Sequence, residues 1–299
     1  MIIVKYRALG KTDLNVSVIG VGTWQFGGEW GINFNQLEVD HILAKAQEVG
    51  INFIDTAECY GDHLSENFIG DYINRHNRED WMIATKFGHH FQRNFERTRH
   101  WSANEVLQQL DASLKSLKTD YIDLYQAHSP GDDEFDNDQL WTMLDKQVQA
   151  GKIRHLGLSL KTNDNIFQTT KASDLNIRAI QVVYNRLDRV PEEKVFPSAE
   201  EQNLGVLARV PLASGYLSGK YKPGASFTAN DVRSRHNEEE ITKLLKQVEE
   251  IQKTEVPKGV PMASWALAWC LENPAVTTVI PGCKTPEQVA LNAKAAELL

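Results

Sequence analysis

Four side chains that together could move a proton lie at or just past the ends of short apolar runs: Asp55, Tyr60, Lys86 and His128. A free tyrosine has a pKa of about 10, and a neighbouring ammonium group favours the phenolate and lowers this pKa. We expect Lys86 to act on Tyr60 in this way, and Asp55 to balance the buried charge of Lys86. His128 can bind a substrate oxygen or relay a proton. A tyrosine tuned by a lysine can donate its proton to a carbonyl oxygen as hydride reaches the carbon.

Each of these residues also has a purely structural interpretation. Asp55 and Lys86 alone could form an ion pair inside the fold. Tyr60 alone could be a packed loop aromatic, and His128 a polar residue satisfied at a strand end. Cys59 is expected to be a small buried hydrophobe, with a redox role as the weaker alternative. The chemical interpretation therefore depends on all four side chains meeting at one place, as perturbed groups do at functional sites.

A parallel β/α fold would bring the four side chains together, because the carboxyl ends of its strands share one edge. Apolar runs bounded by glycine and polar residues predict strands at 18–22, 51–57, 81–87, 121–128, 153–159, 179–185, 205–210 and 277–280. Helical spacing of apolar residues predicts helices at 37–49, 64–76, 102–117, 138–150, 165–172, 192–202, 238–254, 261–272 and 285–299. The stretches 23–34, 88–100 and 211–236 are expected to be loops.

Roughly eight strand–helix units with no shift in composition predict one α/β domain over residues 1–299, folded as a (β/α)8 TIM barrel. Arg7–Ser17 predicts a short hairpin, with Gly10 and Asp13 in its turn. This N-terminal hairpin would cap the bottom of the barrel. The residues predicted to converge at the opposite rim are Asp55, Lys86, His128, Ser159 and Gln181, with Tyr60 on the loop after the second strand.

The composition argues against several functional classes. The 299 residues carry a net charge of −8, which repels nucleic acid and anionic lipid, and no apolar run is long enough to span a bilayer. The first residues lack the layout of a secretion signal. The three cysteines, at 59, 270 and 283, are too scattered for a disulfide framework or a zinc site. We expect a cytoplasmic protein, a monomer rather than a stable oligomer, that binds a small carbonyl compound and no metal, nucleic acid or membrane.

Three motifs around the proton-transfer residues resemble the aldo-keto reductase family: DTAECYG, ATKFG and DYIDLYQAH. The resemblance extends from LGKTDLNVSVIGVGTW to the last predicted helix, and its details are similar to the bacterial stress-protein branch related to potassium-channel β-subunits. It implies a (β/α) barrel that uses NADPH to reduce aldehydes and ketones. The family's catalytic tetrad then falls on Asp55, Tyr60, Lys86 and His128.

The sequence contains no dinucleotide fingerprint, because Gly20–Gln25 breaks off before the third glycine. TIM barrels instead bind phosphate after their last strands, which here means 280–286. Thr285 and Gln288 predict a capping box at a helix start, where phosphate is attracted, and Lys284 adds positive charge. This pattern favours a 2′-phosphate and hence NADP over NAD. The alternative is that Thr285 and Gln288 only cap the helix and that Lys284 is solvated.

The resemblance also implies a set of cofactor contacts along the chain. The set covers the loop beside the nicotinamide ribose, the ligands of the nicotinamide amide, a loop over the pyrophosphate and the adenine end. It consists of Gly22, Thr23, Trp24, Asp55, Ser159, Gln181, Arg209, Pro211, Leu212, Ser214, Gly215, Leu217, Lys220, Arg233, Arg235, Gly282, Lys284, Gln288 and Asn292. Three positions depart from the family pattern: Leu160 replaces an asparagine, Arg209 the aromatic that stacks on the nicotinamide, and Leu291 a glutamate. A guanidinium plane can also stack.

Two other classes of function are consistent with parts of the pattern. An NADP(H)-binding sensor or auxiliary subunit would hold the cofactor but turn over little. A TIM-barrel metal hydrolase would need converging ligands, and the predicted rim offers only His128 and Asp55 in suitable places. The chain stops soon after the last predicted helix, whereas many relatives continue into a tail over the substrate pocket. We therefore expect an open pocket with broad substrates and with Trp24, Trp30 and Phe87 as its walls or as packed core.

Overall fold

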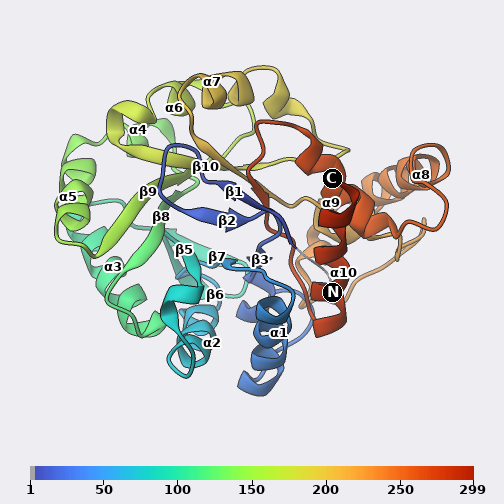
Figure 1. Cartoon of the computed structure of the whole chain (residues 1–299), viewed down its shortest axis with the longest axis horizontal. Coiled ribbons are helices and arrows are strands. Elements are labelled where there is room, and N and C mark those ends of the chain that lie inside the picture. Colours follow the sequence, from blue (N-terminus) through green and yellow to red (C-terminus); the bar gives the residue numbers. More distant parts are fainter. Residues whose placement is uncertain (1–3) are drawn as a thin grey trace.

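Eight short parallel strands curl into a barrel in the computed structural model, which describes residues 4–299 (Figure 1). Neighbouring strands in the barrel mostly follow one another along the chain. Bridges from Ile19 to Val279 and from Gly22 to Gly282 join the first strand to the last and close the barrel. The barrel strands are β3 (Val21–Gly22), β4 (Phe53–Asp55), β5 (Met82–Phe87), β8 (Ile122–His128), β9 (Ile153–Ser159), β10 (Ile177–Val183), β11 (Gly205–Arg209) and β12 (Thr278–Val279).

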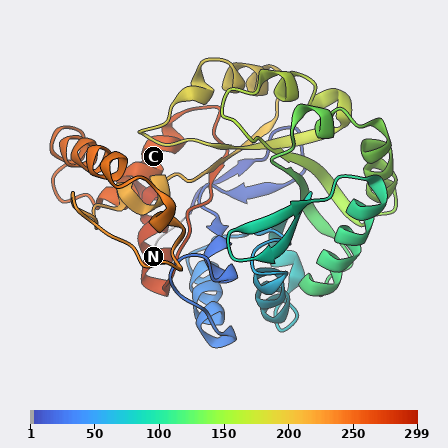
Figure 2. The same cartoon turned by 180° about the vertical axis from the view of Figure 1, so that it is seen from behind.

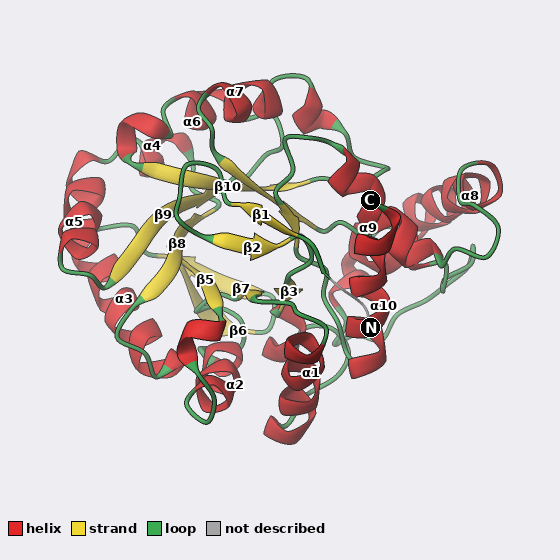
Figure 3. Ribbon diagram, viewed as in Figure 1, coloured by secondary structure: helices red, strands yellow, loops and turns green. Residues whose placement is uncertain are grey.

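Helices surround the barrel on its outside (Figure 3). Local sequence accounts for several of their ends. Ser102 and Glu105 form the predicted capping box at the start of one helix, and Gly50 follows another with a left-handed φ of 84°. The helices are α1 (Gln36–Glu48), α2 (Leu64–Ile73), α3 (Ala103–Leu117), α4 (Asp132–Phe135), α5 (Asp138–Gln149), α6 (Ile166–Thr170), α7 (Val195–Glu201), α8 (Glu238–Thr254), α9 (Met262–Glu272) and α10 (Pro286–Ala293).

The barrel interior is divided into an apolar layer and a polar layer by the two-residue repeat of its strands. The apolar layer contains Phe53, Ala84, Leu124, Ala179 and Leu207, all buried in one cluster. Two residues further along the same strands, the side chains on the same face are polar. This second layer consists of Asp55, Lys86, Gln126, Gln181 and Arg209.

An antiparallel hairpin of β1 (Tyr6–Ala8) and β2 (Asn15–Ser17) crosses the front of the barrel in Figure 1. Leu9, Leu14 and Val16 from this segment belong to the same buried cluster as the apolar layer. Leu9 rests on the bare backbone of Gly205, since a Cβ there would lie 2.4 Å from the Leu9 Cδ1 atom. The side chains of the hairpin therefore complete the apolar layer.

The segment predicted as a loop at 88–100 forms a second antiparallel hairpin, of β6 (His89–Arg93) and β7 (Glu96–Arg99). Figure 2, seen from behind, shows it (teal) in front of the barrel. Its sequence is too polar to predict a strand, but a tertiary contact holds it in place. Buried Glu29 accepts hydrogen bonds from Phe95 N at 2.5 Å and from Arg97 Nη2 at 2.5 Å.

Other differences from the predicted elements are the short helix α4, which was not predicted, and small shifts at element ends. The β10 strand begins and ends two residues earlier than predicted. The predicted loop 211–236 contains short 3-10 turns at Ala213–Ser218 and Val232–Arg235, and the predicted last helix becomes 3-10 after Ala293. Along residues 4–299, none of the helices has the length and apolar character needed to cross a membrane.

Replacing Leu9 by alanine should lower the free energy of unfolding by about 2–5 kcal/mol, because it removes a fully buried side chain from the apolar layer and leaves a cavity. Urea denaturation of the wild type and the variant measures this loss. Leu37→Ala, at an exposed leucine, is the matched control and should change stability little. Equal effects at both positions would contradict the packing role of Leu9.

Candidate active site

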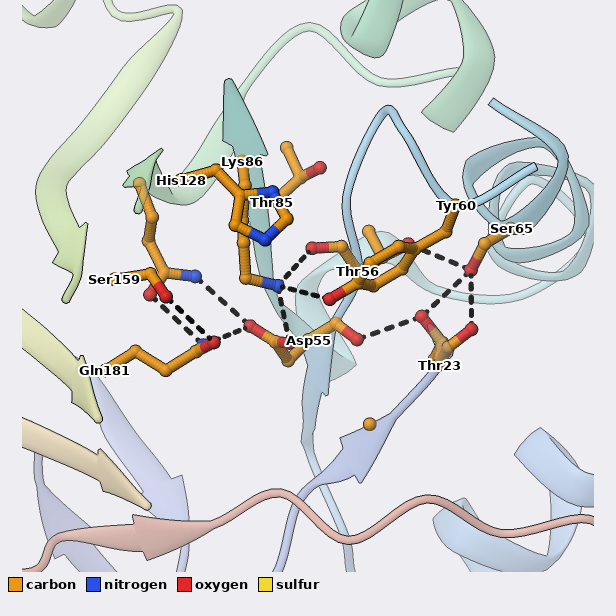
Figure 4. A network of polar contacts seen from close by, with 12 residues as sticks. Thr23, Asp55, Thr56, Tyr60, Ser65, Thr85, Lys86, His128, Ser159 and Gln181 are labelled. Atoms are coloured by element: carbon orange, nitrogen blue, oxygen red, sulfur yellow. Dashed lines mark hydrogen bonds and ion pairs between the residues drawn. The ribbon is translucent and has the colours of Figure 1, made fainter. Parts of the chain in front are cut away.

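The polar layer meets at the ammonium group of Lys86, whose side chain is almost completely buried (Figure 4). The Nζ atom lies 2.7 Å from Asp55 Oδ1, 2.7 Å from the main-chain oxygen of Thr56 and 3.3 Å from the Tyr60 hydroxyl. All of the lysine's donors therefore have oxygen partners. The predicted meeting of Asp55, Tyr60 and Lys86 is present in the structure.

Asp55 is held on every side by further hydrogen bonds. Its Oδ2 atom accepts from Gln181 Nε2 at 2.7 Å and from Gln126 Nε2 at 3.1 Å. Its main-chain oxygen accepts from Thr23 N at 3.0 Å and from Thr23 Oγ1 at 2.9 Å. Gln126 was not among the residues predicted from the sequence. Its position two residues before His128 on the same strand was the signal that could have identified it.

The balance of effects on Tyr60 differs from the expectation that Lys86 lowers its pKa. Burial of the hydroxyl raises the pKa of Tyr60 to about 12, and Lys86 offsets only part of this rise. For Lys86, burial lowers the pKa, but Asp55 and Tyr60 more than compensate, so the net pKa lies above its usual value. At neutral pH the tyrosine thus keeps its proton and the lysine keeps its charge.

His128 faces Tyr60 with its ring plane at 85° to the tyrosine ring and the two ring centres 6.2 Å apart. Burial, followed by the neighbouring His89 and Lys86, holds the pKa of His128 well below its usual value. The imidazole is therefore neutral and can donate one hydrogen bond from one nitrogen. Cys59 Sγ lies 3.7 Å from His128 Nδ1.

His89, at the start of β6, stacks on His128 with ring centres 4.5 Å apart and planes 23° apart. Burial, followed by Arg99 and Arg97, lowers the pKa of His89 to about 4. Sequence analysis did not identify His89, because it places the segment 88–100 in a loop. No local pattern could have found it, since the stacking depends on how the β6–β7 hairpin folds back over the barrel.

Two tryptophans border the tyrosine. Trp24 stacks beside Tyr60 with ring centres 6.2 Å apart, and Trp30 meets Trp24 edge-on at 5.2 Å. Glu29 fixes this wall by accepting a hydrogen bond from Trp24 Nε1 at 2.6 Å. Phe87, the third aromatic considered as a pocket wall, is fully buried and packs in the core against Trp101.

The residues expected at the nicotinamide lie beside the tetrad. Ser159 Oγ is 3.5 Å from Gln181 Oε1, and both side chains are buried. Arg209 enters the same layer from β11. Its Nη2 donates to Leu160 O at 3.2 Å, while its buried Nε has no hydrogen-bond partner among residues 4–299. Burial also lowers the pKa of Arg209. A buried donor without a partner is energetically costly. The Nε–H group of Arg209 is therefore suited to donate a hydrogen bond to an acceptor atom of a ligand.

The start of α10 differs in one detail from the predicted capping box. Thr285 caps the helix by accepting from Gln288 N at 3.3 Å, but the Gln288 side chain accepts from Lys284 N at 2.7 Å instead of returning to Thr285. Lys284 Nζ donates to Trp30 O at 2.5 Å, and burial, followed by Arg233, lowers the pKa of this lysine. Asn292 is buried further along the same helix.

The loop expected to cover the pyrophosphate contains left-handed backbone at Ser214 and Gly215, with φ of 58° and 89°. Arg233, expected among the cofactor contacts, is buried and bound to Asp231 at 2.6 Å and to the Tyr221 hydroxyl at 2.7 Å. Arg235 lies over the ring of Phe95. The other expected residues of this group lie in the loop or at the barrel closure: Pro211, Leu212, Leu217, Lys220, Gly22 and Gly282.

Two of these residues have a structural role that is visible in the fold. Leu217 is fully buried in the cluster that packs α8 against the 211–220 segment, so its side chain cannot reach a ligand. Gly22 lies in the bridge that closes the barrel, where a Cβ would be 2.6 Å from Ile280 O. Glycine at position 22 is therefore required by close backbone approach.

The chain belongs to the aldo/keto reductase family, whose profile matches residues 18–299. The holo form of the aldo-keto reductase AKR11C1 from Bacillus halodurans superimposes with a TM-score of 0.81 at 31% identity, over 98% of this chain and 91% of that chain. The fold thus agrees with the family.

Curated relatives cover nearly the whole chain. It is 32% identical to aldo-keto reductase YhdN of Bacillus subtilis, over 95% of this chain and 86% of the relative. It is 31% identical to a putative voltage-gated potassium channel subunit beta of Schizosaccharomyces pombe, over 99% and 89%. It is 30% identical to the NADH-specific methylglyoxal reductase of Escherichia coli, over 97% and 93%. The family therefore includes both enzymes and proteins named as channel subunits.

Replacing Lys86 by methionine should lower the free energy of unfolding by about 3–5 kcal/mol, because it leaves the buried Asp55 carboxylate without its counter-ion. Urea denaturation measures this loss. The double variant Lys86→Met/Asp55→Asn removes both charges and should recover a large part of the stability. A single variant as stable as the wild type would show that the pair is not the centre of this layer.

Proposed function

We propose that the protein is an NADPH-dependent oxidoreductase that reduces aldehydes and ketones to alcohols, with Tyr60 as the proton donor. The observation that carries the proposal is the contact of 3.3 Å between the Tyr60 hydroxyl and the charged Lys86, beside a neutral His128. A protonated phenol next to a fixed positive charge can release its proton to an oxygen on which negative charge develops. The family supplies the reaction class, and this geometry supports the assignment of roles.

The bound nicotinamide would supply the hydride to the carbonyl carbon. Tyr60 would give its proton to the carbonyl oxygen, and Lys86 would stabilise the phenolate that remains. Asp55, through its two glutamine partners, would keep Lys86 oriented toward the tyrosine. His128, as a neutral donor, would hold the carbonyl oxygen within reach of the Tyr60 hydroxyl.

The donors beside the tetrad fit a dinucleotide phosphate cofactor. Ser159 and Gln181 present amide-binding groups next to Asp55, and Arg209 offers its unpartnered Nε. The charge of Lys284 and the partial positive charge at the N-terminus of α10 would attract a 2′-phosphate. One relative is named as NADH-specific, so family membership alone does not decide between the cofactors. The preference for NADP rests on Lys284 in this chain.

A second candidate function is an NADP(H)-binding sensor or auxiliary subunit with little turnover. The similarity to a protein named as a potassium channel subunit beta favours it. Tight binding of NADPH without transfer to any aldehyde would support this function instead of the reductase.

We further propose that residues 1–299 form a single domain that acts as a cytoplasmic monomer, with the β1–β2 hairpin closing the barrel end opposite the site. The three scattered free cysteines support the cytoplasmic setting, and the packing of the hairpin into the apolar layer supports its place in the barrel. Light scattering that gives twice the mass of one chain would exclude the monomer.

Tyr60→Phe should lower kcat for aldehyde reduction about 10²–10⁴-fold, which is the usual contribution of general acid catalysis, while the Kd for NADPH stays unchanged. Initial rates of NADPH oxidation with a panel of aldehydes, together with fluorescence titration of NADPH, measure the two quantities. Tyr6→Phe, which removes the hydroxyl of an exposed tyrosine on the β1–β2 hairpin, is the control. Unchanged turnover in Tyr60→Phe would remove the tyrosine from the mechanism.

Lys284→Met should weaken NADPH binding about 10–100-fold and leave NADH binding nearly unchanged, because a charged hydrogen bond contributes about 1.5–3 kcal/mol and NADH has no 2′-phosphate. Parallel titrations with both cofactors measure the selectivity. Lys294→Met, an exposed lysine at the other end of α10, is the matched control. Equal losses for both cofactors would show that Lys284 does not recognise the phosphate.

A further inference from the structure

Three metal-binding side chains converge next to the tyrosine: Cys59, His89 and His128. One ligand atom from each lies within 4.8 Å of the others. They come from the loop after β4, the first residue of β6 and the last residue of β8. Sequence analysis led us to expect no metal, because the cysteines are scattered and the predicted rim offers only His128 and Asp55 as ligands. The folded β6–β7 hairpin brings the third ligand to the site.

The distances are close to those of a tetrahedral zinc site. Zinc bonds of about 2.3 Å to sulfur and about 2.0–2.1 Å to nitrogen place sulfur and nitrogen ligands about 3.6 Å apart at the tetrahedral angle. The observed separation of Cys59 Sγ and His128 Nδ1 is 3.7 Å. His89 must turn out of its stack on His128 to bring a nitrogen equally close. It is partly exposed on the hairpin, which leaves room for this rotation.

The ligand types select a soft or borderline cation. Zinc binds both cysteine sulfur and histidine nitrogen, so one thiolate with two imidazoles can hold it, and three protein ligands leave a fourth position open. A metal binds the neutral form of an imidazole and the thiolate form of a cysteine. The thiol proton of Cys59 would therefore pass to solvent as the bond from sulfur to the metal forms.

Three of the positive side chains around the ligands are paired with carboxylates. Lys86 is bound to Asp55 and Arg97 to Glu29. Arg99 is bound to Glu134 and also contacts His89 Nε2 at 3.2 Å, a contact that metal binding would replace. Arg209 acts on His128 and Lys161 acts on His89, and neither cation has a carboxylate partner among residues 4–299. Two unpaired charges therefore oppose a bound dication, and the thiolate formed on binding offsets one of them.

We propose that Cys59, His89 and His128 form a binding site for a thiophilic divalent cation, with Zn²⁺ as the expected ion, and that the bound ion inhibits carbonyl reduction. Coordination would fix the His128 ring toward Cys59, so that it no longer orients a carbonyl oxygen beside Tyr60. The inhibition rests on the proposed function, whereas the binding of the ion does not.

Cobalt titration of the full-length protein, kept reduced without a competing thiol, tests the site itself. We expect one Co²⁺ per chain, a charge-transfer absorption from the thiolate, and displacement of cobalt by Zn²⁺. Cys59→Ser should abolish the thiolate absorption. Cys59→Ser and His89→Gln should each weaken Zn²⁺ affinity more than about tenfold, because even the loss of a residue that only hydrogen-bonds to a metal ligand weakens affinity by about that factor. Cys270→Ser, at a buried thiol far along the chain, is the matched control. No cobalt binding, or binding that is unchanged in Cys59→Ser, would overturn the site.

Zinc inhibition of aldehyde reduction tests the consequence. Each variant is compared with its own rate in the presence of a chelator. We expect Zn²⁺ to inhibit the wild type and Cys270→Ser at the same concentration. Cys59→Ser should need a zinc concentration more than about ten times higher for the same fractional inhibition. Binding of Co²⁺ with turnover unaffected by Zn²⁺ would overturn the inhibition. A protein that binds Co²⁺ but reduces no aldehyde would contradict the proposed function and leave the metal site established.

Discussion

The structure depends on the burial of one charged side chain, Lys86. An ammonium group in the middle of a barrel is tolerated only when it is paired and hydrogen-bonded. Asp55, Thr56 and Tyr60 supply its three oxygen partners, and the glutamines around Asp55 hold the carboxylate in place. The same requirement that keeps the lysine stable brings the tyrosine hydroxyl beside a positive charge. Stability and the proposed chemistry therefore share one set of contacts.

The layering of the barrel explains how this charged group is combined with a stable core. Every second residue of a strand faces the barrel interior, and successive interior positions are first apolar and then polar. Phe53 and Asp55 therefore lie on the same face of β4 at different depths. The hairpin β1–β2 adds apolar side chains to the first layer only. The polar layer lies at the carboxyl ends of the strands, beside the loops that follow them.

His128 has a role in both proposals, carbonyl reduction and metal binding. Its ring lies edge-on to Tyr60, stacks on His89 and approaches Cys59 Sγ with its Nδ1 atom. The β6–β7 hairpin decides how close His89 comes, and Glu29 anchors both that hairpin and Trp24. A single buried carboxylate therefore positions the aromatic wall of the site and the third ligand of the proposed metal site.

The sequence by itself determined the barrel, most strand positions and which polar residues end the strands, because apolar periodicity and the residues that end each strand are local signals. β9 and α8 begin and end where the pattern predicts. Only the tertiary structure decided the pKa of Tyr60, the pairing of Arg233 with Asp231, the roles of Gln126 and His89, and the fold of the segment 88–100. These features depend on burial and on contacts between residues distant in the chain. Hydrophobic periodicity does not encode which polar groups meet once the barrel closes.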